Sequence, residues 1–379
     1  MIIFGFQFQH MIKRKFNIDR QLFEETSHSP ALTDIVGEDL ADQVIDYCFI
    51  ANPYYPTAEM MEQLKSKLAS IIKAYPSSNP KLARQHLAEV LHVNPDYLIL
   101  GNGATELITI TGKYLIDEIA IPIPTFSEYV EKLHSSDAAR LFQLSPDDSY
   151  RLDLKEYAAW IKANNINSAL IINPGNPTGQ LMPVKNLQWF LREMSHLKLI
   201  LLDESFIDFA DEDIPSLLPF IEAYENLVIV RSMSKHCGVP GLRLGYCCTS
   251  NHQLLKQIRD FLPVWNINSI AEYFLLQLKN SNEIYHQTRL RVIEDVKDLY
   301  QKLVKIRGYK VYPTGSNFIL IKIEFGMKAA ELQWQLLEEG LYVRDCSNKI
   351  GLDEYHIRVS SQGKEKDQFL IEALKRLSS

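Results

Sequence analysis

Short apolar runs alternate with amphipathic stretches along most of the chain from Asn94 onward. Runs rich in aliphatic residues predict strands, and apolar positions spaced three or four apart predict helices. The predicted strands are Tyr97–Leu100, Glu118–Ile121, Ala139–Leu144, Ser168–Ile172, Lys198–Leu202, Leu227–Val230 and Leu242–Cys247. The predicted helices are Tyr55–Ile72, Ala104–Leu115, Ser127–Leu133, Leu154–Ala163 and Val184–Ser195. Strands that alternate with helices are typical of a mostly parallel sheet covered by helices, so we expect an α/β fold.

The pattern changes after about Phe261. A long helical stretch, Ser269 to Arg307, leads into shorter elements that indicate a smaller α+β domain. These elements are strands at Tyr309–Tyr312, Asn317–Ile323, Leu341–Val343 and Tyr355–Val359, a helix at Ala329–Glu339 and a last helix from Gly363. We therefore expect three parts. They are an N-terminal arm (1–45) that contributes to the small domain, a large domain (46–262) and a small C-terminal domain (263–379).

Lys235 stands in the run RSMSKHCGVPGLRLGY, directly after the strand that ends at Val230. Lysine is the side chain that forms a Schiff base with the aldehyde of pyridoxal phosphate. Ser232, Ser234 and Arg243 in the same run supply the hydroxyls and the guanidinium that a nearby phosphate dianion needs. A solvated turn could have the same residues, so this run alone leaves open whether it is a cofactor site or a turn.

Two further polar clusters each close a predicted strand. NPGNPTG, which contains Asn176, follows Ser168–Ile172, and Asp203 ends the apolar run of LILLDESFIDF. Ligands of open α/β sheets collect at the carboxyl ends of the strands, so these clusters should face one crevice. A carboxylate there can keep the pyridine nitrogen of the cofactor protonated, and an asparagine can donate to its phenolate oxygen. Taken singly, the first cluster is compatible with an ordinary turn and Asp203 with a helix cap.

With Lys235, Asp203 and Asn176 in this order, the chain resembles the fold-type-I pyridoxal-phosphate enzymes of the class I/II aminotransferase superfamily. Within it, the sequence is similar to the branch of histidinol-phosphate aminotransferase and threonine-phosphate decarboxylase. The resemblance runs from about Asp46 to the C-terminus. It implies the aspartate aminotransferase-like fold, with a seven-stranded sheet in the large domain, and pyridoxal 5′-phosphate as cofactor. In one departure, Phe206 stands where many aminotransferases have a tyrosine that donates to the phenolate oxygen.

The resemblance assigns the cofactor-binding residues one by one. It makes Lys235 the Schiff-base lysine, pairs Asp203 with the pyridinium and directs Asn176 to the phenolate oxygen. Ser232, Ser234 and Arg243 would hold the cofactor phosphate. GNGATE before a predicted helix adds the backbone N–H groups of Gly103, Ala104 and Thr105, because a helix N-terminus favours an anion. Phe126 in IPTFSEY would stack on the pyridine ring, although a core phenylalanine fits the same pattern.

Tyr75 in KAYPSSNP matches the tyrosine that reaches the cofactor phosphate of a neighbouring subunit in this superfamily. The resemblance therefore implies a homodimer with shared active sites. A surface tyrosine before a proline turn is the alternative.

Three residues near the C-terminus are candidates for substrate binding. By the resemblance, Arg358 in YHIRVSSQ binds the substrate carboxylate and Arg344 in LYVRDCSNKIGL binds a second anion. Asn317 in PTGSNFIL is a weaker candidate for the same pocket. Two fixed guanidinium groups suit a small substrate that carries both a carboxylate and a phosphate, although most arginines are ordinary surface cations.

The reaction is open between two outcomes. RDCSN, DESFIDF and PVWNIN resemble the threonine-phosphate decarboxylases, whereas the His-Gly-Gly sequence of those enzymes is absent near the N-terminus. We expect an aminotransferase that acts on a small phosphorylated amine, amino acid or ketone. A decarboxylase of L-threonine or L-serine O-phosphate is the alternative. A silent binding domain of the same fold is the third, and three intact cofactor residues argue against it.

Composition and charge narrow the context. The chain has 379 residues, 46% of them hydrophobic and 23% charged, and a net charge of −7, which disfavours nucleic acids and anionic membranes as partners. Its five cysteines lack paired spacing, so we expect neither disulfides nor a metal site. The apolar run Met1–Phe8 is too short for a membrane span and lacks the basic start of a signal, and Met11 is an alternative first residue. We therefore expect a cytoplasmic protein.

Overall fold

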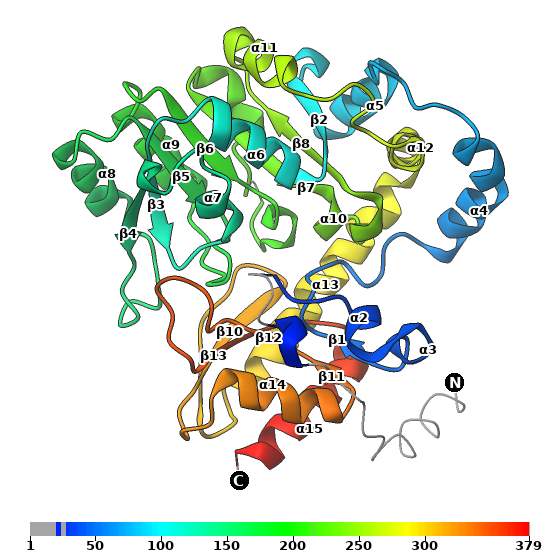
Figure 1. Cartoon of the computed structure of the whole chain (residues 1–379), viewed down its shortest axis with the longest axis vertical. Coiled ribbons are helices and arrows are strands. Elements are labelled where there is room, and N and C mark those ends of the chain that lie inside the picture. The colour runs from blue at the N-terminus through cyan, green and yellow to red at the C-terminus, as the bar shows by residue number, and fades with distance from the viewer. Residues whose placement is uncertain (1–19, 24–27, 214, 379) are drawn as a thin grey trace. The chain divides into compact units, whose positions relative to one another are not determined.

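The computed structural model describes residues 20–23, 28–213 and 215–378 (Figure 1). The chain divides into two compact units, one made of residues 1–50 and 294–379 and the other of residues 51–293. The expectations for Met1–Phe8 and Met11 lie outside the described residues. The predicted domain boundaries at 46 and 263 remain a prediction. In the part of the chain that is described, no helix has the length and apolar character needed to cross a membrane.

The second unit is built on a sheet of seven strands. Its spatial order is β2-β8-β7-β6-β5-β3-β4, and β8 is the antiparallel member. The strands are β2 (Leu98–Asn102), β3 (Ile119–Ile123), β4 (Ala139–Gln143), β5 (Ser168–Ile172), β6 (Leu199–Asp203), β7 (Leu227–Ser232) and β8 (Leu244–Cys248). In β6, β7 and β8 every residue is buried, as expected of strands covered on both faces. The parallel strands end at one edge of the sheet, which is where the polar motifs lie.

Helices cover this sheet. Those of the second unit are α4 (Ala58–Ile72), α5 (Lys81–Leu91), α6 (Ala104–Tyr114), α7 (Glu128–Glu131), α8 (Leu154–Ala163), α9 (Val184–Glu193), α10 (Met233–His236), α11 (His252–Asp260) and α12 (Ser269–Gln277). One core cluster joins apolar side chains of α6, α7 and α11 to β2, β3, β5, β6, β7 and β8. Figure 1 shows α6 and α7 over this face of the sheet. On α8, the Tyr157 hydroxyl donates to the carbonyls of Ala120 and Leu170 and ties that helix to β3 and β5.

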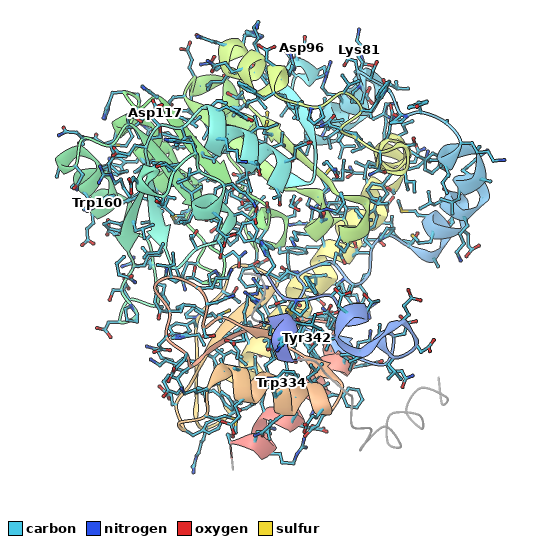
Figure 2. All side chains as sticks on the ribbon, in the orientation of Figure 1. Lys81, Asp96, Asp117, Trp160, Trp334 and Tyr342 are labelled. Carbon is cyan, nitrogen blue, oxygen red and sulfur yellow. The ribbon has the colours of Figure 1, made fainter. Side chains whose placement is uncertain are left out.

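The first unit is a smaller α+β assembly. Its four-stranded sheet has the order β12-β13-β10-β9, made of β12 (Arg344–Asp345), β13 (His356–Ser360), β10 (Phe318–Ile323) and β9 (Tyr309–Val311). The helices α2 (Leu32–Val36), α3 (Glu38–Ala41), α14 (Ala329–Glu338) and α15 (Lys364–Leu377) belong to it, together with the second half of α13 (Asn282–Leu303). The short strands β1 (Ile45–Asp46) and β11 (Leu341–Tyr342) pair in parallel. The buried Tyr342 packs edge-on against Phe23, which also contacts Trp334 (Figure 2).

The α/β fold with a smaller second assembly confirms the predicted fold class. The predicted helix at Tyr55 was placed three residues too early, because Thr57 caps the helix and Pro56 precedes it. The long helical stretch predicted at Ser269–Arg307 is present from Ser269 to Leu303. It is divided into α12, a 3-10 turn (Leu278–Ser281) and α13.

Candidate active site

The N-terminus of α6 forms a close contact with the segment that carries Arg243. Gly103 has φ +74°, its N–H donates to the Arg243 carbonyl at 2.9 Å, and any β-carbon on it would collide with the Arg243 guanidinium. A β-carbon on Gly245 would likewise collide with the backbone nitrogen of Ala104. The first N–H groups of a helix, here those of Ala104 and Thr105, have no partners within it. The two close contacts place these N–H groups near the Arg243 guanidinium. This is an anion-binding arrangement.

Lys235 lies on the one-turn helix α10, which directly follows β7. Its carbonyl accepts from the N–H of Asn52 at 2.8 Å. Ser232 caps the helix and is tied by its N–H to the Ser205 hydroxyl at 3.0 Å. Ser234 is 1% exposed, and its Oγ has no hydrogen-bond partner among the described residues. A buried hydroxyl without a partner is costly, and a bound phosphate would supply one.

Asp203 ends β6 and is 5% exposed. Its Oδ2 accepts from the Tyr129 hydroxyl at 2.8 Å, and its Oδ1 accepts from the Ser205 N–H at 2.8 Å. Burial raises the pKa of Asp203, while the hydrogen bonds from Ser205 and Tyr129 oppose that rise. A cation placed beside this buried carboxylate would relieve the cost of burying its charge.

The other two predicted ring contacts lie at the ends of neighbouring strands. Asn176 is half-buried in the loop after β5, where the Asn173 N–H donates to the Asp203 carbonyl at 2.8 Å. Phe126 follows β3, is half-buried and packs edge-on against Tyr129 with 6.3 Å between the ring centroids. Phe206, three residues after Asp203 in the sequence, is buried and has no hydroxyl group.

Two residues of this site were missed at the sequence level. Tyr129 stands in the same IPTFSEY run as Phe126, three residues further on and at the second position of α7, and this spacing was the available signal. Ser205 joins two predicted residues, because it donates to Asp203 and accepts from Ser232. No spacing rule indicates the second contact, which depends on the pairing of β6 with β7.

The predicted substrate residues all belong to the first unit. Arg344 on β12 is 8% exposed and donates to Ser29 Oγ at 2.5 Å and to Asn348 Oδ1 at 2.9 Å. Arg358 lies opposite it on β13 and donates to the Cys48 carbonyl at 2.9 Å. Burial lowers the pKa of Arg358, although an arginine stays charged at neutral pH.

Asn317, directly before β10, is fully buried. Its Nδ2 has no hydrogen-bond partner among the described residues. The two guanidinium groups are neighbours across one strand pair, which suits binding of more than one negative charge. The orphaned amide of Asn317 is a further donor on the adjacent strand.

Tyr75 lies in the second unit and is 84% exposed. Its ring stands 5.1 Å from that of Trp265, which is also exposed. Nothing within the described chain buries this side chain, and its role in a neighbouring subunit stays a prediction.

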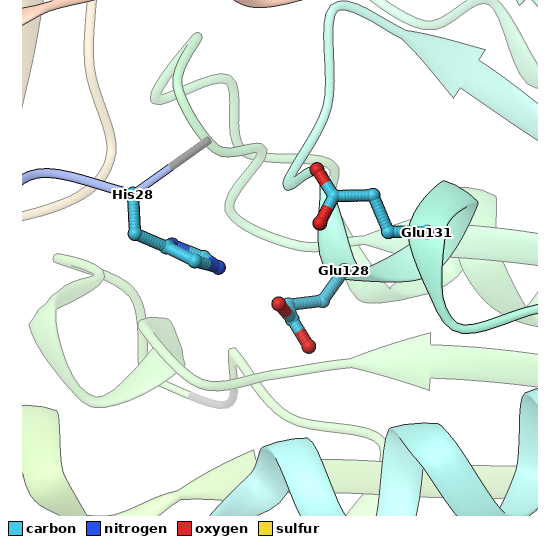
Figure 3. Close-up of side chains that lie close together, drawn as sticks. All are labelled: His28, Glu128 and Glu131. Atoms are coloured by element: carbon cyan, nitrogen blue, oxygen red, sulfur yellow. The ribbon is translucent and has the colours of Figure 1, made fainter. Parts of the chain in front are cut away.

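Glu128 and Glu131 both project from α7 (Figure 3). Figure 3 also draws His28, which belongs to the other unit, so we do not combine the three as metal ligands. Glu128 is paired instead with Lys132 on the same helix, at 3.8 Å.

The donor set of the second unit fits pyridoxal phosphate. The cradle at Gly103, the orphaned Ser234 hydroxyl and the Arg243 guanidinium suit its phosphate. The buried carboxyl of Asp203 suits its pyridinium, and Lys235 suits its aldehyde.

Comparison with known proteins agrees with this fit. The family model "Aminotransferase class I and II" matches residues 44–374, and the chain therefore belongs to this family. Its cofactor is pyridoxal 5′-phosphate, as predicted. The L-serine phosphate decarboxylase of Campylobacter jejuni is 32% identical over 368 residues, which cover 92% of each chain.

Two solved structures share the fold. A decarboxylase from Sulfurospirillum multivorans superposes with a TM-score of 0.79 at 30% identity and covers 88% of this chain and 95% of its own. The histidinol-phosphate aminotransferase of Clostridium acetobutylicum gives 0.80 at 26% identity, with 88% and 99% covered. The predicted branch of the family is confirmed. Of the two predicted reactions, these relatives support the decarboxylase, which we had ranked second, better than the aminotransferase.

Proposed function

We propose that this protein is a pyridoxal-phosphate-dependent decarboxylase of L-serine O-phosphate. The observation that carries the proposal is the 32% identity to an L-serine phosphate decarboxylase across 92% of both chains. The reaction removes the carboxylate as carbon dioxide, places one proton on the α-carbon and leaves O-phosphoethanolamine.

The substrate has two anionic groups, and the first unit offers two guanidinium groups for them. Ser29 and Asn348 hold two nitrogens of the Arg344 guanidinium, so its remaining N–H groups point in a fixed direction. We assign Arg344 to the phosphate, because a planar guanidinium held at two nitrogens matches phosphate oxygens. Arg358 is assigned to the carboxylate. A decarboxylase must hold that group by its oxygens while leaving the bond to the α-carbon free to break.

When bound, pyridoxal phosphate supplies an electron sink for the electron pair left on the α-carbon. The residues of this chain do the rest. The carboxylate of Asp203 would accept a hydrogen bond from the pyridine nitrogen and so keep that nitrogen protonated. Lys235 Nζ is assigned as the proton donor to the α-carbon, because a positioned lysine amine can act as a general acid or base.

The test is to incubate the holoenzyme with O-phospho-L-serine or O-phospho-L-threonine, with and without 2-oxoglutarate. We expect carbon dioxide release from O-phospho-L-serine in the absence of any keto acid. Arg344→Gln should raise KM about 10- to 100-fold, the cost of one charged hydrogen-bond pair. Arg140→Gln, which removes an exposed pair with Glu118, is the matched control and should leave KM unchanged.

Aminotransfer is the second candidate, because the chain also resembles a histidinol-phosphate aminotransferase. Glutamate formation that requires 2-oxoglutarate, without release of carbon dioxide, would overturn the decarboxylase in its favour. Preference for O-phospho-L-threonine would retain the reaction and change the substrate.

A further inference from the structure

Lys235 sits on a helix of only four residues. One helical turn is not stable by itself, so its position depends on the residues that pack against it. Two connections from α13 reach this turn. The first runs through Asn52, whose N–H donates to the Lys235 carbonyl and whose Nδ2 lies 3.2 Å from both the His236 carbonyl and Thr288 Oγ1.

The second connection runs through side chains. His236, the neighbour of Lys235, has its Nδ1 2.9 Å from the Tyr285 hydroxyl. That hydroxyl donates to Asp208 Oδ1 at 2.8 Å. A tyrosine hydroxyl has a single proton, so the His236 Nδ1 must carry the proton in its own bond to Tyr285. We call Asp208, Tyr285 and His236 the triad.

The charged groups around the triad favour this direction of its hydrogen bonds, in which His236 donates to Tyr285 and Tyr285 donates to Asp208. Arg231 lies 3.4 Å from Asp208, and Arg289 donates to the Asp208 carbonyl. Burial raises the pKa of Asp208, but His236 and Arg231 outweigh it, so the pKa is below its ordinary value. Burial lowers the pKa of His236, and Asp208 only partly offsets this. At neutral pH the triad is therefore a carboxylate, a hydroxyl and a neutral imidazole.

We infer that His236, held by Tyr285 and Asp208, is a positioning residue that sets the placement of Lys235 at the cofactor. The mechanism above does not use these three side chains, although His236 is nine-tenths buried. The inference rests on Lys235 being the cofactor lysine. It is independent of the substrate, since every candidate reaction shares that lysine.

The test uses the visible absorbance of the holoenzyme, titrated with pH in the absence of substrate. Tyr285→Phe removes both hydrogen bonds of the triad and retains the ring. With both bonds lost, the turn that carries Lys235 keeps only the first of these two connections, so the surroundings of the Lys235 amine at the cofactor change. We expect the midpoint of the absorbance transition to shift by about 0.5 to 1 pH unit.

The two amide replacements of His236 provide a matched pair. In His236→Asn the side-chain amide can take the place of Nδ1–H, and the midpoint should return to within about 0.2 units of the unmodified protein. His236→Gln places its amide nearer the Nε2 position and should shift the midpoint as Tyr285→Phe does. His196→Asn, at an exposed histidine outside this helix, is the control.

A purely structural role predicts a different result. In that case Tyr285→Phe lowers the melting temperature and leaves the midpoint unchanged, which would overturn the inference. Equal behaviour of His236→Asn and His236→Gln would do the same. Borohydride reduction followed by mass spectrometry identifies the attached lysine, and an adduct at a lysine other than Lys235 would remove the premise.

Discussion

Asp203 is a carboxyl group whose charge depends on its immediate neighbours. Burial raises its pKa above the ordinary value, and the donors Ser205 and Tyr129 oppose that rise. A pyridinium pairs well only with an ionised carboxylate, so these donors bear directly on cofactor binding. Tyr129 is the one that can be removed without disturbing the backbone.

We predict that Tyr129→Phe weakens cofactor binding about tenfold, the cost of one hydrogen bond to a charged group. The pKa of Asp203 should rise when this donor is lost. The carboxyl group is then more protonated at low pH, so the loss of affinity should be larger near pH 6 than near pH 8. Equilibrium binding of pyridoxal phosphate, followed by absorbance at both pH values, measures this. Tyr114→Phe, at an exposed tyrosine of α6, is the control, and an equal loss at both pH values would contradict the argument.

The sequence singled out Lys235, Asp203 and Asn176, and their roles at the cofactor stay predictions. Each lies at the end of a strand or a few residues after it, where ligands of an open α/β sheet collect. Tyr129 and His236 stood in the same motifs and were missed. Their partners, Asp203 and Tyr285, lie 74 and 49 residues away, and no local pattern encodes such a pairing.

The N-terminus of α15 contains a buried carboxyl group. Asp367 is fully buried and accepts from Ser361 Oγ at 2.5 Å and from the Gln362 N–H at 2.8 Å. Burial raises the pKa of Asp367 to about 7, the two donors oppose this, and Asp295 and Asp298 add to it. The helix therefore begins on an acid that is protonated in the folded state well above its ordinary pKa.

This pKa predicts how stability depends on pH. Between about pH 4 and pH 7 the folded state retains a proton that the unfolded state has lost, so stability falls as the pH rises through this range. Asp367→Asn resembles the protonated acid, and its amide can serve the same two partners. The variant should be more stable than the unmodified protein by about 2 kcal/mol near pH 5 and by up to about 4 kcal/mol near pH 8.

Urea unfolding at the two pH values measures this difference. Glu365→Gln, at an exposed acid in the same turn, is the control and should change stability little at either pH. A variant that is less stable than the unmodified protein at both values would show that the carboxylate, rather than the acid, is the stabilising form.

Elements were predictable in proportion to their length and periodicity. β5 and α8 have the bounds that the pattern predicts, since each is a continuous apolar or amphipathic run. The strand predicted at Leu341–Val343 is β11 (Leu341–Tyr342), whereas β1 was not predicted. β1 has two residues, and it exists because Ile45 and Asp46 find partners about 300 positions away. Such a strand is a consequence of the fold rather than of local propensity.

For the whole molecule, the resemblance to the aminotransferase superfamily predicts a homodimer with shared active sites. The second unit exposes several large apolar side chains, among them Ile72, Tyr75, Val264 and Trp265. Tyr75 and Trp265 pack against each other at 5.1 Å, and the Ser269 hydroxyl donates to the Ala74 carbonyl, so their two segments lie together. Exposed apolar side chains gathered in this way are typical of interaction surfaces, and they favour the predicted assembly.

Mixing damaged subunits tests whether Tyr75 serves the neighbouring site. Lys235→Ala and Tyr75→Ala subunits should each have little activity alone. In a mixed dimer, one site then has both lesions and the other has none, so random mixing should restore roughly a quarter of full activity. Lys235→Ala mixed with Asp203→Asn is the matched control. Both of those lesions lie in a chain's own site, every mixed dimer has two damaged sites, and no activity should return. A mass near the 43.6 kDa of one chain in light scattering, or no recovery with Tyr75→Ala, would contradict a shared site, because each chain would then hold a site complete in itself.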